Sequence, residues 1–330
     1  MAMLSRPSTT ALILMCFDAE PHCTNAIAIS SGLTLPDGRK LSYAAYGSTS
    51  TTAPVVFYHH GFPASHAEAR LYDTAAQKHE IRLIAIDRPG MGNSTYQPNR
   101  QLLDWPAHLL ALTDHLKVEQ FGILGTSGGG PYVLACWHSI PRSRCGSAGI
   151  HVGPLPEELG HCGYVVRGAN DAVHCALAGR AGCLGSGQGS RSHCERRGAS
   201  REVRTGTCQY ITSGPPVDRE LWNRDVGGFR QTLVESTRGA VHDGGHGPAW
   251  EARLFGSNWG FPLEELSADA GKMFLWHGGA DLNVPAHMAE TAAKLMNGAE
   301  LRFSPDEGHA SLAVNKSDDI VAALRGFLPT

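Results

Sequence analysis

The pentapeptide Gly125-Thr126-Ser127-Gly128-Gly129 constrains the fold more than any other feature of the chain. An apolar run, residues 121–124, precedes it, and a helix-like stretch, residues 131–137, follows it. The pattern G-x-S-x-G between a strand and a helix places the serine in a sharp, strained turn, whose neighbours must be nearly free of side chain. A glycine-rich turn with an incidental serine is the alternative. The flanking strand and helix favour a serine hydroxyl presented at the end of a buried strand.

A serine is a weak nucleophile unless a base takes its proton and a third group orients that base. Residues 272–277 predict a buried strand, and the loop after it contains Asp281. Residues 299–304 alternate apolar and polar side chains, as an edge strand does, and the loop after them ends at His309. Asp281 and His309 are therefore the candidate acid and base.

Other acids and histidines compete for these roles. Asp306 and Glu307 are closer to His309 in sequence, but Asp281 alone directly follows a buried strand. The chain has 17 histidines, of which His277 lies inside a predicted strand and His60 precedes the serine. Position along the chain therefore favours His309.

An oxyanion hole needs two backbone N–H donors, one of them from the residue after the nucleophile. Gly128 supplies that donor. The predicted strand over residues 54–59 leads into His60-Gly61-Phe62-Pro63, where the amide of Phe62 is the second candidate, since proline has no N–H. We interpret His60 as a structural residue of this loop that also borders the substrate pocket.

Together these motifs resemble the α/β-hydrolase-fold serine hydrolases of the AB hydrolase-1 type. The resemblance covers about residues 33–150 and 215–330 and runs through Leu35-Pro36-Asp37-Gly38-Arg39-Lys40-Leu41, the loop at Gly61, Asp87-Arg88-Pro89-Gly90-Met91-Gly92-Asn93-Ser94, the Ser127 turn, Gly279-Ala280-Asp281 and Gly308-His309. It implies a mostly parallel eight-stranded sheet flanked by helices, with a cap or lid inserted between the sixth strand and the strand before Asp281. Fold membership by itself names no substrate.

Alternation of strands and helices agrees with such an α/β sheet. We expect strands over residues 41–46, 54–59 and 81–86 and helices over residues 67–78, 105–116, 285–296 and 320–327. Asp87 and Arg88 follow one of these strands, and we interpret both as structural. The 330 residues are expected to form a poorly ordered N-terminal extension (1–32), a core (33–150 and 215–330) and a cap insertion of anomalous composition (151–214).

Residues 161–208 are rich in Gly, Arg, Ser and His and hold five of the nine cysteines. Their cysteine spacing gives none of the C-x-x-C pairs typical of zinc sites. Disulfides are not favoured either, since the core carries no sign of an oxidising compartment. Our hypothesis is translation out of frame or across an unspliced intron, with the result that part of the cap cannot bury a core. An in-frame tryptic peptide from this stretch would contradict it.

Composition limits the partners. A formal net charge of −3 and the absence of basic patches argue against nucleic acid, and no apolar run is long enough to span a bilayer. We expect a small-molecule substrate, no stable membrane insertion and a cytoplasmic location, with an N-terminal targeting segment as the less favoured alternative.

The expected activity is hydrolysis of an ester, thioester or lactone of a small apolar molecule through an acyl-enzyme, with no metal and no cofactor. Phe255, Trp259 and Phe261 are expected to add apolar lining to the pocket. A carbon-carbon bond hydrolase, a cofactor-free peroxidase or a lyase on the same catalytic triad is the alternative, as is a vestigial, non-catalytic protein.

Overall fold

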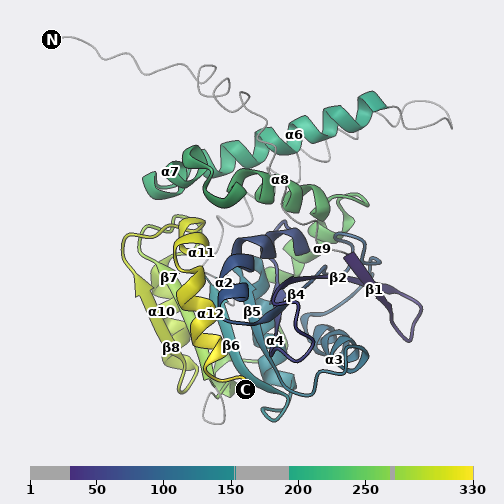
Figure 1. Ribbon diagram of the computed structural model, residues 1–330, viewed down its shortest axis with the longest axis vertical. Helices are drawn as coiled ribbons and strands as arrows, with labels where there is room; N and C mark the ends of the chain where they lie inside the picture. The colour runs from purple at the N-terminus through teal and green to yellow at the C-terminus, as the bar shows by residue number, and fades with distance from the viewer. Residues whose placement is uncertain (1–29, 152, 154–192, 268–271, 330) are drawn as a thin grey trace.

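A central sheet organises the computed structural model, which describes residues 30–151, 153, 193–267 and 272–329 (Figure 1). Within these residues the sheet has eight strands in the order β1-β2-β4-β3-β5-β6-β7-β8. The strands are β1 (Ser30–Thr34), β2 (Lys40–Gly47), β3 (Val55–His59), β4 (Arg82–Ile86), β5 (Phe121–Thr126), β6 (Cys145–His151), β7 (Lys272–Gly278) and β8 (Glu300–Ser304). Strand β2 pairs antiparallel with β1 and β4, and the other neighbours pair in parallel. This confirms the predicted fold class.

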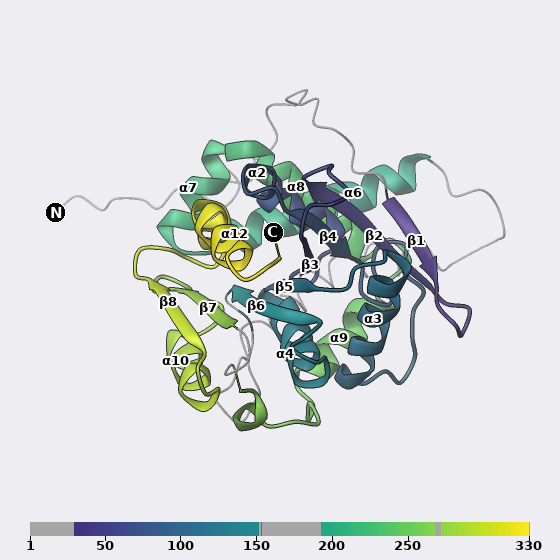
Figure 2. The same ribbon diagram turned by 60° about the horizontal axis from the view of Figure 1, so that its bottom comes forward.

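Helices cover both faces of the sheet (Figure 2). The described α-helices, with the 3-10 helix η1 (His66–Tyr72), are α2 (Asp73–Lys78), α3 (Trp105–His115), α4 (Gly130–Ser139), α6 (His193–Thr212), α7 (Pro216–Arg224), α8 (Phe229–Ala240), α9 (His246–Phe255), α10 (Ala286–Leu295), α11 (Ser311–Asn315) and α12 (Ser317–Arg325). One apolar core joins the sheet to α3, α4 and α10, and a second joins its other face to η1, α2, α11 and α12. None of the described helices is long and apolar enough to cross a membrane.

The central strands are buried on both faces, which explains their nearly continuous apolar sequences. Every residue of β3 and β5 is buried, and in β4 only Arg82 is partly exposed. Strand β8 lies at the edge, as its alternating sequence predicted. The helix expected over residues 67–78 is instead a 3-10 helix continued by α2. The sequence analysis missed β1, which starts inside the expected N-terminal extension, and β6; residues 1–29 lie outside the described part.

Among the described residues between β6 and β7, where the resemblance implies a cap, the structure has the four α-helices α6 to α9. Helices α6, α7 and α8 pack on one another beside the sheet (Figure 1) and share a small core that includes Ile211, Trp222 and Phe229. Because α7 and α8 lie beyond residue 214, we propose that the cap continues past the boundary expected for it. Its end, like the rest of the domain division, is a proposal.

The anomalous stretch, residues 161–208, is described only from residue 193 onward. Its last turns belong to α6, where Val203, Thr207 and Cys208 are buried on the face that also carries Ile211. The expectation that the stretch cannot bury a core is therefore wrong for these turns, because their apolar side chains recur at helical spacing. Cys208 is disulfide-bonded, which the sequence analysis did not expect.

Candidate active site

Ser127 lies at the sharp turn from β5 into α4 that its motif predicts. Its backbone has φ +46°, a left-handed conformation that is uncommon for a residue with a side chain. The turn is so tight that it leaves no room for side chains at its glycines. A Cβ on Gly125 would lie 2.7 Å from the carbonyl carbon of Gly129, and one on Gly129 would overlap the His59 carbonyl. The glycines of the motif therefore permit the strained turn that carries the serine.

His309 and Asp281 meet Ser127 at this turn. The Nε2 atom of His309 is 3.0 Å from the Ser127 hydroxyl oxygen, and its Nδ1 atom is 2.8 Å from Oδ2 of Asp281. The other oxygen of Asp281 accepts hydrogen bonds from the amides of Asn283 and Val284, at 2.7 and 3.1 Å. The three residues thus form one chain of hydrogen bonds, although Ser127 and His309 are 182 residues apart.

Of the three carboxylates considered for the acid, Asp281 is the one that the structure brings to His309. The carboxylate of Glu307 instead accepts hydrogen bonds from Asn315, at 3.0 and 3.2 Å. The strand-to-loop position of Asp281 therefore located the contact better than closeness in sequence did.

Electrostatics couples His309 to Asp281. Burial alone would lower the pKa of His309, but the charge and hydrogen bond of Asp281 outweigh it and raise that pKa above its ordinary 6.5. Burial acts to raise the pKa of Asp281, yet His309 and two backbone amides hold it below its ordinary value. The pair therefore favours an ionised carboxylate beside an imidazole that accepts a proton readily.

The two amides expected to form the oxyanion hole are neighbours. A Cβ on Gly128 would lie 3.2 Å from the amide nitrogen of Phe62. The carbonyl of Gly61, which shares a peptide group with that nitrogen, accepts hydrogen bonds from Arg88 Nη2 at 2.9 Å and from His60 Nδ1 at 2.8 Å. The peptide group between Gly61 and Phe62 is planar, so its C=O and N–H can rotate only together. The hydrogen bonds to the carbonyl therefore also fix the direction of the Phe62 N–H.

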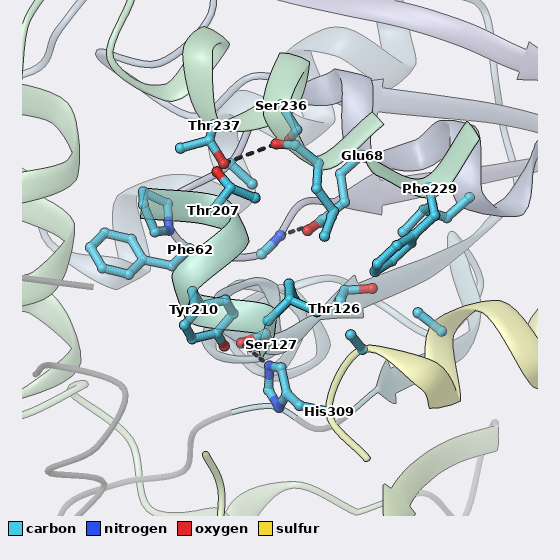
Figure 3. Close-up of a pocket in the computed structure, with 18 of the residues that line it drawn as sticks. Phe62, Glu68, Thr126, Ser127, Thr207, Tyr210, Phe229, Ser236, Thr237 and His309 are labelled. Atoms are coloured by element: carbon cyan, nitrogen blue, oxygen red, sulfur yellow. Dashed lines mark hydrogen bonds between the residues drawn. The ribbon is translucent and has the colours of Figure 1, made fainter. Parts of the chain in front are cut away.

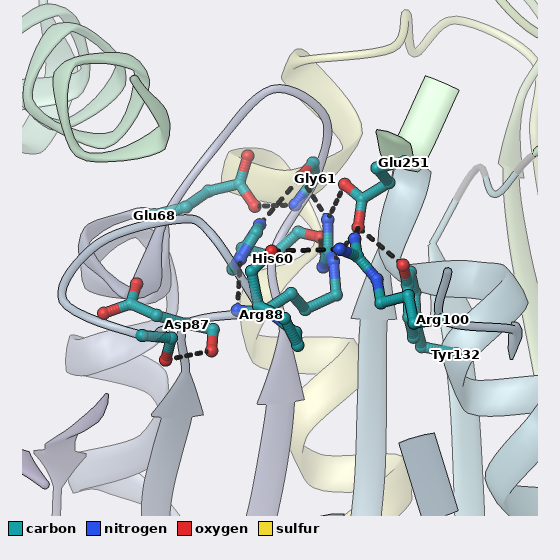
Figure 4. A network of polar contacts seen from close by, with 10 residues as sticks. His60, Gly61, Glu68, Asp87, Arg88, Arg100, Tyr132 and Glu251 are labelled. Carbon is teal, nitrogen blue, oxygen red and sulfur yellow. Dashed lines mark hydrogen bonds and ion pairs between the residues drawn. The ribbon is translucent and has the colours of Figure 1, made fainter. Parts of the chain in front are cut away.

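Arg88 connects this loop to the cap (Figure 4). Its guanidinium makes two hydrogen bonds to the carboxylate of Glu251 on α9, at 2.6 and 2.8 Å, and both side chains are fully buried. Tyr132, at the start of α4, donates to the same carboxylate at 2.7 Å. Asp87 is also buried and accepts hydrogen bonds from Ser42 and His66, at 2.6 and 2.8 Å. The surroundings of Asp87 and Arg88 agree with the structural interpretation of both residues.

A cavity lies between the core and the cap beside Ser127 and His309 (Figure 3). From the core, Phe62, Leu71 and Ala313 add apolar surface. The cap lines it with apolar and hydroxyl side chains, namely Ile211, Phe229, Leu233, Thr207, Tyr210, Ser236 and Thr237. The wall is therefore mostly apolar, with hydroxyl groups on the cap side.

The pocket residues expected from sequence lie elsewhere, and that expectation is corrected. His60 is fully buried beneath the loop, where its Nε2 accepts the Arg88 amide at 3.3 Å. Phe255 packs edge-on against Phe62, with ring centroids 5.4 Å apart, on the side of Gly128. Trp259 and Phe261 pack on each other in the core. None of the four lines the cavity, and Phe255, Trp259 and Phe261 are buried in the core cluster instead.

Sequence reasoning missed three polar residues near the site: Glu68, Tyr210 and Asp218. Glu68 lines the cavity with 8% of its surface exposed, and its Oε2 accepts hydrogen bonds from the Gly61 amide and the Tyr58 hydroxyl, at 2.5 and 2.8 Å. Burial raises the pKa of its carboxyl group. No motif marks these residues, since each reaches the site through tertiary packing.

The ranges that the structure describes hold no group of three or more His, Cys, Asp or Glu side chains placed to bind a metal ion.

Comparisons with known proteins agree with the α/β fold of the chain. A family model for the alpha/beta hydrolase fold matches residues 54–149. A proline iminopeptidase of Lactobacillus helveticus (strain DPC 4571) is 33% identical over 97 residues, which are 28% of this chain and 33% of that protein. One from Lactobacillus crispatus (strain ST1) is 31% identical over 101 residues, 29% and 34% of the two chains. The chain therefore spans about a third of the length of these relatives.

Solved structures are similar over nearly the whole chain. An esterase from Exiguobacterium antarcticum matches with a TM-score of 0.63 at 15% identity, over 91% of this chain and 99% of that one. An enol-lactonase from Burkholderia xenovorans LB400 matches with a TM-score of 0.61 at 16% identity, over 90% and 99%. A bromoperoxidase from Bacillus anthracis matches with 0.63 at 17%, over 90% and 98%. At these identities the likeness establishes the fold.

Proposed function

This chain belongs to the α/β-hydrolase-fold family, and from that premise we propose that it is a serine hydrolase that cleaves an ester, thioester or lactone of a small apolar molecule. The observation that carries the proposal is the hydrogen-bonded chain from Ser127 through His309 to Asp281, at 3.0 and 2.8 Å. Such a chain supplies a nucleophile, a base and a group that orients the base.

In the proposed mechanism, His309 Nε2 takes the hydroxyl proton as the Ser127 oxygen attacks the substrate carbonyl. The amides of Phe62 and Gly128 stabilise the resulting oxyanion. The C–O or C–S bond to the leaving group then breaks, and His309 returns the proton to that group. His309 next takes a proton from water, whose oxygen attacks the acyl carbon. The bond from that carbon to the Ser127 oxygen then breaks, His309 returns the proton to this oxygen, and the acid is released. Asp281 stabilises the charged imidazole in both half-reactions.

The cavity supports a small, apolar acyl group. Phe62, Leu71 and Phe229 place apolar surface around the serine, and burying an apolar group against them is favourable by about 25 cal/mol per Å². The esterase and enol-lactonase with the same fold are consistent with this class of substrate.

Labelling with a fluorophosphonate, which reacts with activated serines, tests the proposal. The folded protein is expected to be labelled, and Ser127→Ala and His309→Ala are expected to abolish labelling because each removes one end of the proton transfer. His79→Ala is the matched control, since His79 bonds Asp318 on the far helices. A folded wild-type protein that resists labelling would contradict the proposal and favour a vestigial protein.

Cleavage of an N-terminal amino acid is a second candidate, and the proline iminopeptidases that match the chain favour it. The same three residues would attack an amide carbonyl, with His309 protonating the leaving amine. Comparing proline p-nitroanilide with short p-nitrophenyl esters separates the two candidates, because only the peptidase is expected to release p-nitroaniline.

A further inference from the structure

A carboxylate of the cap holds the loop that carries His309. Asp218 lies on α7, and 3% of its surface is exposed. Its two oxygens accept hydrogen bonds from the amides of Ser311, at 2.8 Å, and Ala310, at 3.3 Å, the two residues directly after His309. These are the first amides of α11 and its N-cap, which have no partner inside the helix.

The approach of this carboxylate depends on Gly308, on the other side of His309. A Cβ on Gly308 would lie 2.5 Å from Oδ1 of Asp218, closer than a side-chain carbon is found to any such atom. The Gly308 amide donates in turn to the Ser311 hydroxyl at 2.8 Å. The cap carboxylate therefore holds the loop after the imidazole and lies close against the glycine before it.

A second cap residue contacts the loop that carries Asp281. Asn283 donates from its side chain to the hydroxyl of Tyr210, on α6, at 2.7 Å. The backbone amide of the same Asn283 donates to Oδ1 of Asp281 at 2.7 Å. Tyr210 also lines the cavity beside Ser127 (Figure 3), so one cap side chain borders both the substrate space and the acid.

We propose that the cap is a working part of the active site: Asp218 and Tyr210 are positioning residues that hold the His309 and Asp281 loops, so that Ser127 is fully reactive only while α6 and α7 are docked. This inference rests on the proposed function and adds to it, since lining a pocket does not require a cap to bond the loops of the triad. Under this proposal, the fraction of molecules with a fully reactive Ser127 equals the fraction in which α6 and α7 are docked.

Charge reinforces the geometric role of Asp218. The ionisable groups that act on His309 are Asp281, Asp218 and Glu68, which favour its protonated form, and His151 and His277, which face it from β6 and β7. When His309 takes the serine proton, the carboxylate of Asp218 helps to stabilise the imidazolium. An amide at this position would keep the shape of the side chain and lose that charge.

Asp218→Asn is the test, with Asp225→Asn as its matched control. Asp225 ends the same helix and accepts the Arg230 amide at 2.8 Å, within the cap and away from His309. The fluorophosphonate labelling rate of Asp218→Asn is expected to fall about tenfold, since small displacements of a base are costly. The midpoint of its pH profile is expected to shift to lower pH, because a negative charge beside the imidazole is lost. Asp225→Asn should keep the wild-type rate and midpoint.

Equal rates and equal midpoints in the two variants would overturn the proposal. If Asp218→Asn does not fold, Tyr210→Phe replaces it, because that change removes one hydroxyl and leaves the ring in place. Its labelling rate is expected to fall about threefold as the Asp281 loop loosens. An unchanged rate in Tyr210→Phe would then count against the proposal.

A readout that needs no activity separates this inference from the proposed function. If the wild-type protein is not labelled, the proposed function fails, and amide hydrogen exchange over residues 308–311 still tests the contact. Exchange there is expected to be faster in Asp218→Asn than in Asp225→Asn, because the Ala310 and Ser311 amides lose an ionised acceptor. Equal exchange in the two variants would show that Asp218 does not hold the loop.

Discussion

At the scale of single residues, the buried Arg88–Glu251 ion pair orients a backbone group of the site and adds little stability. Both side chains are fully buried, and removing water from two charges costs nearly as much as their attraction returns. The pair is therefore a poor source of stability compared with an apolar packing of the same volume. It does fix the Gly61 carbonyl, and through it the direction of the Phe62 amide.

Glu251→Ala is expected to destabilise the fold by about 3 kcal/mol, because it leaves the Arg88 guanidinium buried without its carboxylate. Labelling of Ser127 should slow as well, since the loop at Gly61 loses its support. Chemical denaturation measures the first effect. Glu235→Ala is the control, because Glu235 pairs with Arg70 at 2.7 Å near the surface, where such a pair contributes less than about 1 kcal/mol. Similar losses in both variants would contradict this account.

The pH dependence of labelling follows from the raised pKa of His309. The base acts only when neutral, so the rate is expected to rise with pH, with a midpoint above 6.5, the ordinary histidine value. The contribution of the same group to folding stability has the opposite sign: it is full below pH 6.5 and is lost as pH rises through the raised pKa. A labelling midpoint below 6.5 would contradict the assignment of His309 as base. Urea unfolding at several pH values checks the stability term.

At the scale of elements, most strands could be predicted because a strand that is buried on both faces has a nearly continuous apolar sequence. Strand β6 has no such apolar run, because it consists mainly of small residues, Cys145-Gly146-Ser147-Ala148-Gly149-Ile150-His151. Their smallness has a structural cause: a Cβ on Gly149 would lie 2.7 Å from the ring of Trp276 on β7. Small residues of this kind indicate a strand only when the large side chains packed against them are known, and those contacts cannot be predicted from the local sequence.

The candidate site divides in the same way. Ser127, Asp281 and His309 each follow a strand directly, so their placement could be predicted from local patterns. Asp218 and Tyr210 belong to helices whose docking is set by tertiary contacts, and the pocket expected from Phe255, Trp259 and Phe261 depended on an unknown path of the chain. Local sequence therefore located the groups at strand ends and missed those supplied by the cap.

Two glycines in different elements are expected to respond in opposite ways to the same substitution. Gly129→Ala should destabilise the fold by about 3 kcal/mol, because its Cβ would overlap the His59 carbonyl and force backbone movement. Gly206→Ala, inside α6 with no atom beyond its chain neighbours and its own helix backbone within 4 Å of the new Cβ, should stabilise it by about 0.5 to 1 kcal/mol. Thermal unfolding of both variants measures the difference. A destabilising Gly206→Ala would show that α6 is not helical at this position.

At the scale of the whole molecule, the candidate site draws on the full length of the fold. The segment that matches the family model, residues 54–149, holds Ser127 and both of the proposed oxyanion donors. The proposed acid and base, Asp281 and His309, come from the loops after β7 and β8, beyond the cap. The serine and its activating residues are therefore joined only through the complete sheet.

Because Ser127 comes before Asp281 and His309 in the chain, the parts of the candidate site are synthesised at different times. Protein synthesis delivers the elements from the N-terminus, and β3 to β6 can pair before β7 and β8 exist. The serine thus leaves the ribosome at the end of a central strand with no base beside it. His309 reaches the Ser127 hydroxyl only when the outer strands join the sheet. Under the proposed function, a nascent chain that lacks these strands therefore carries a serine without its base.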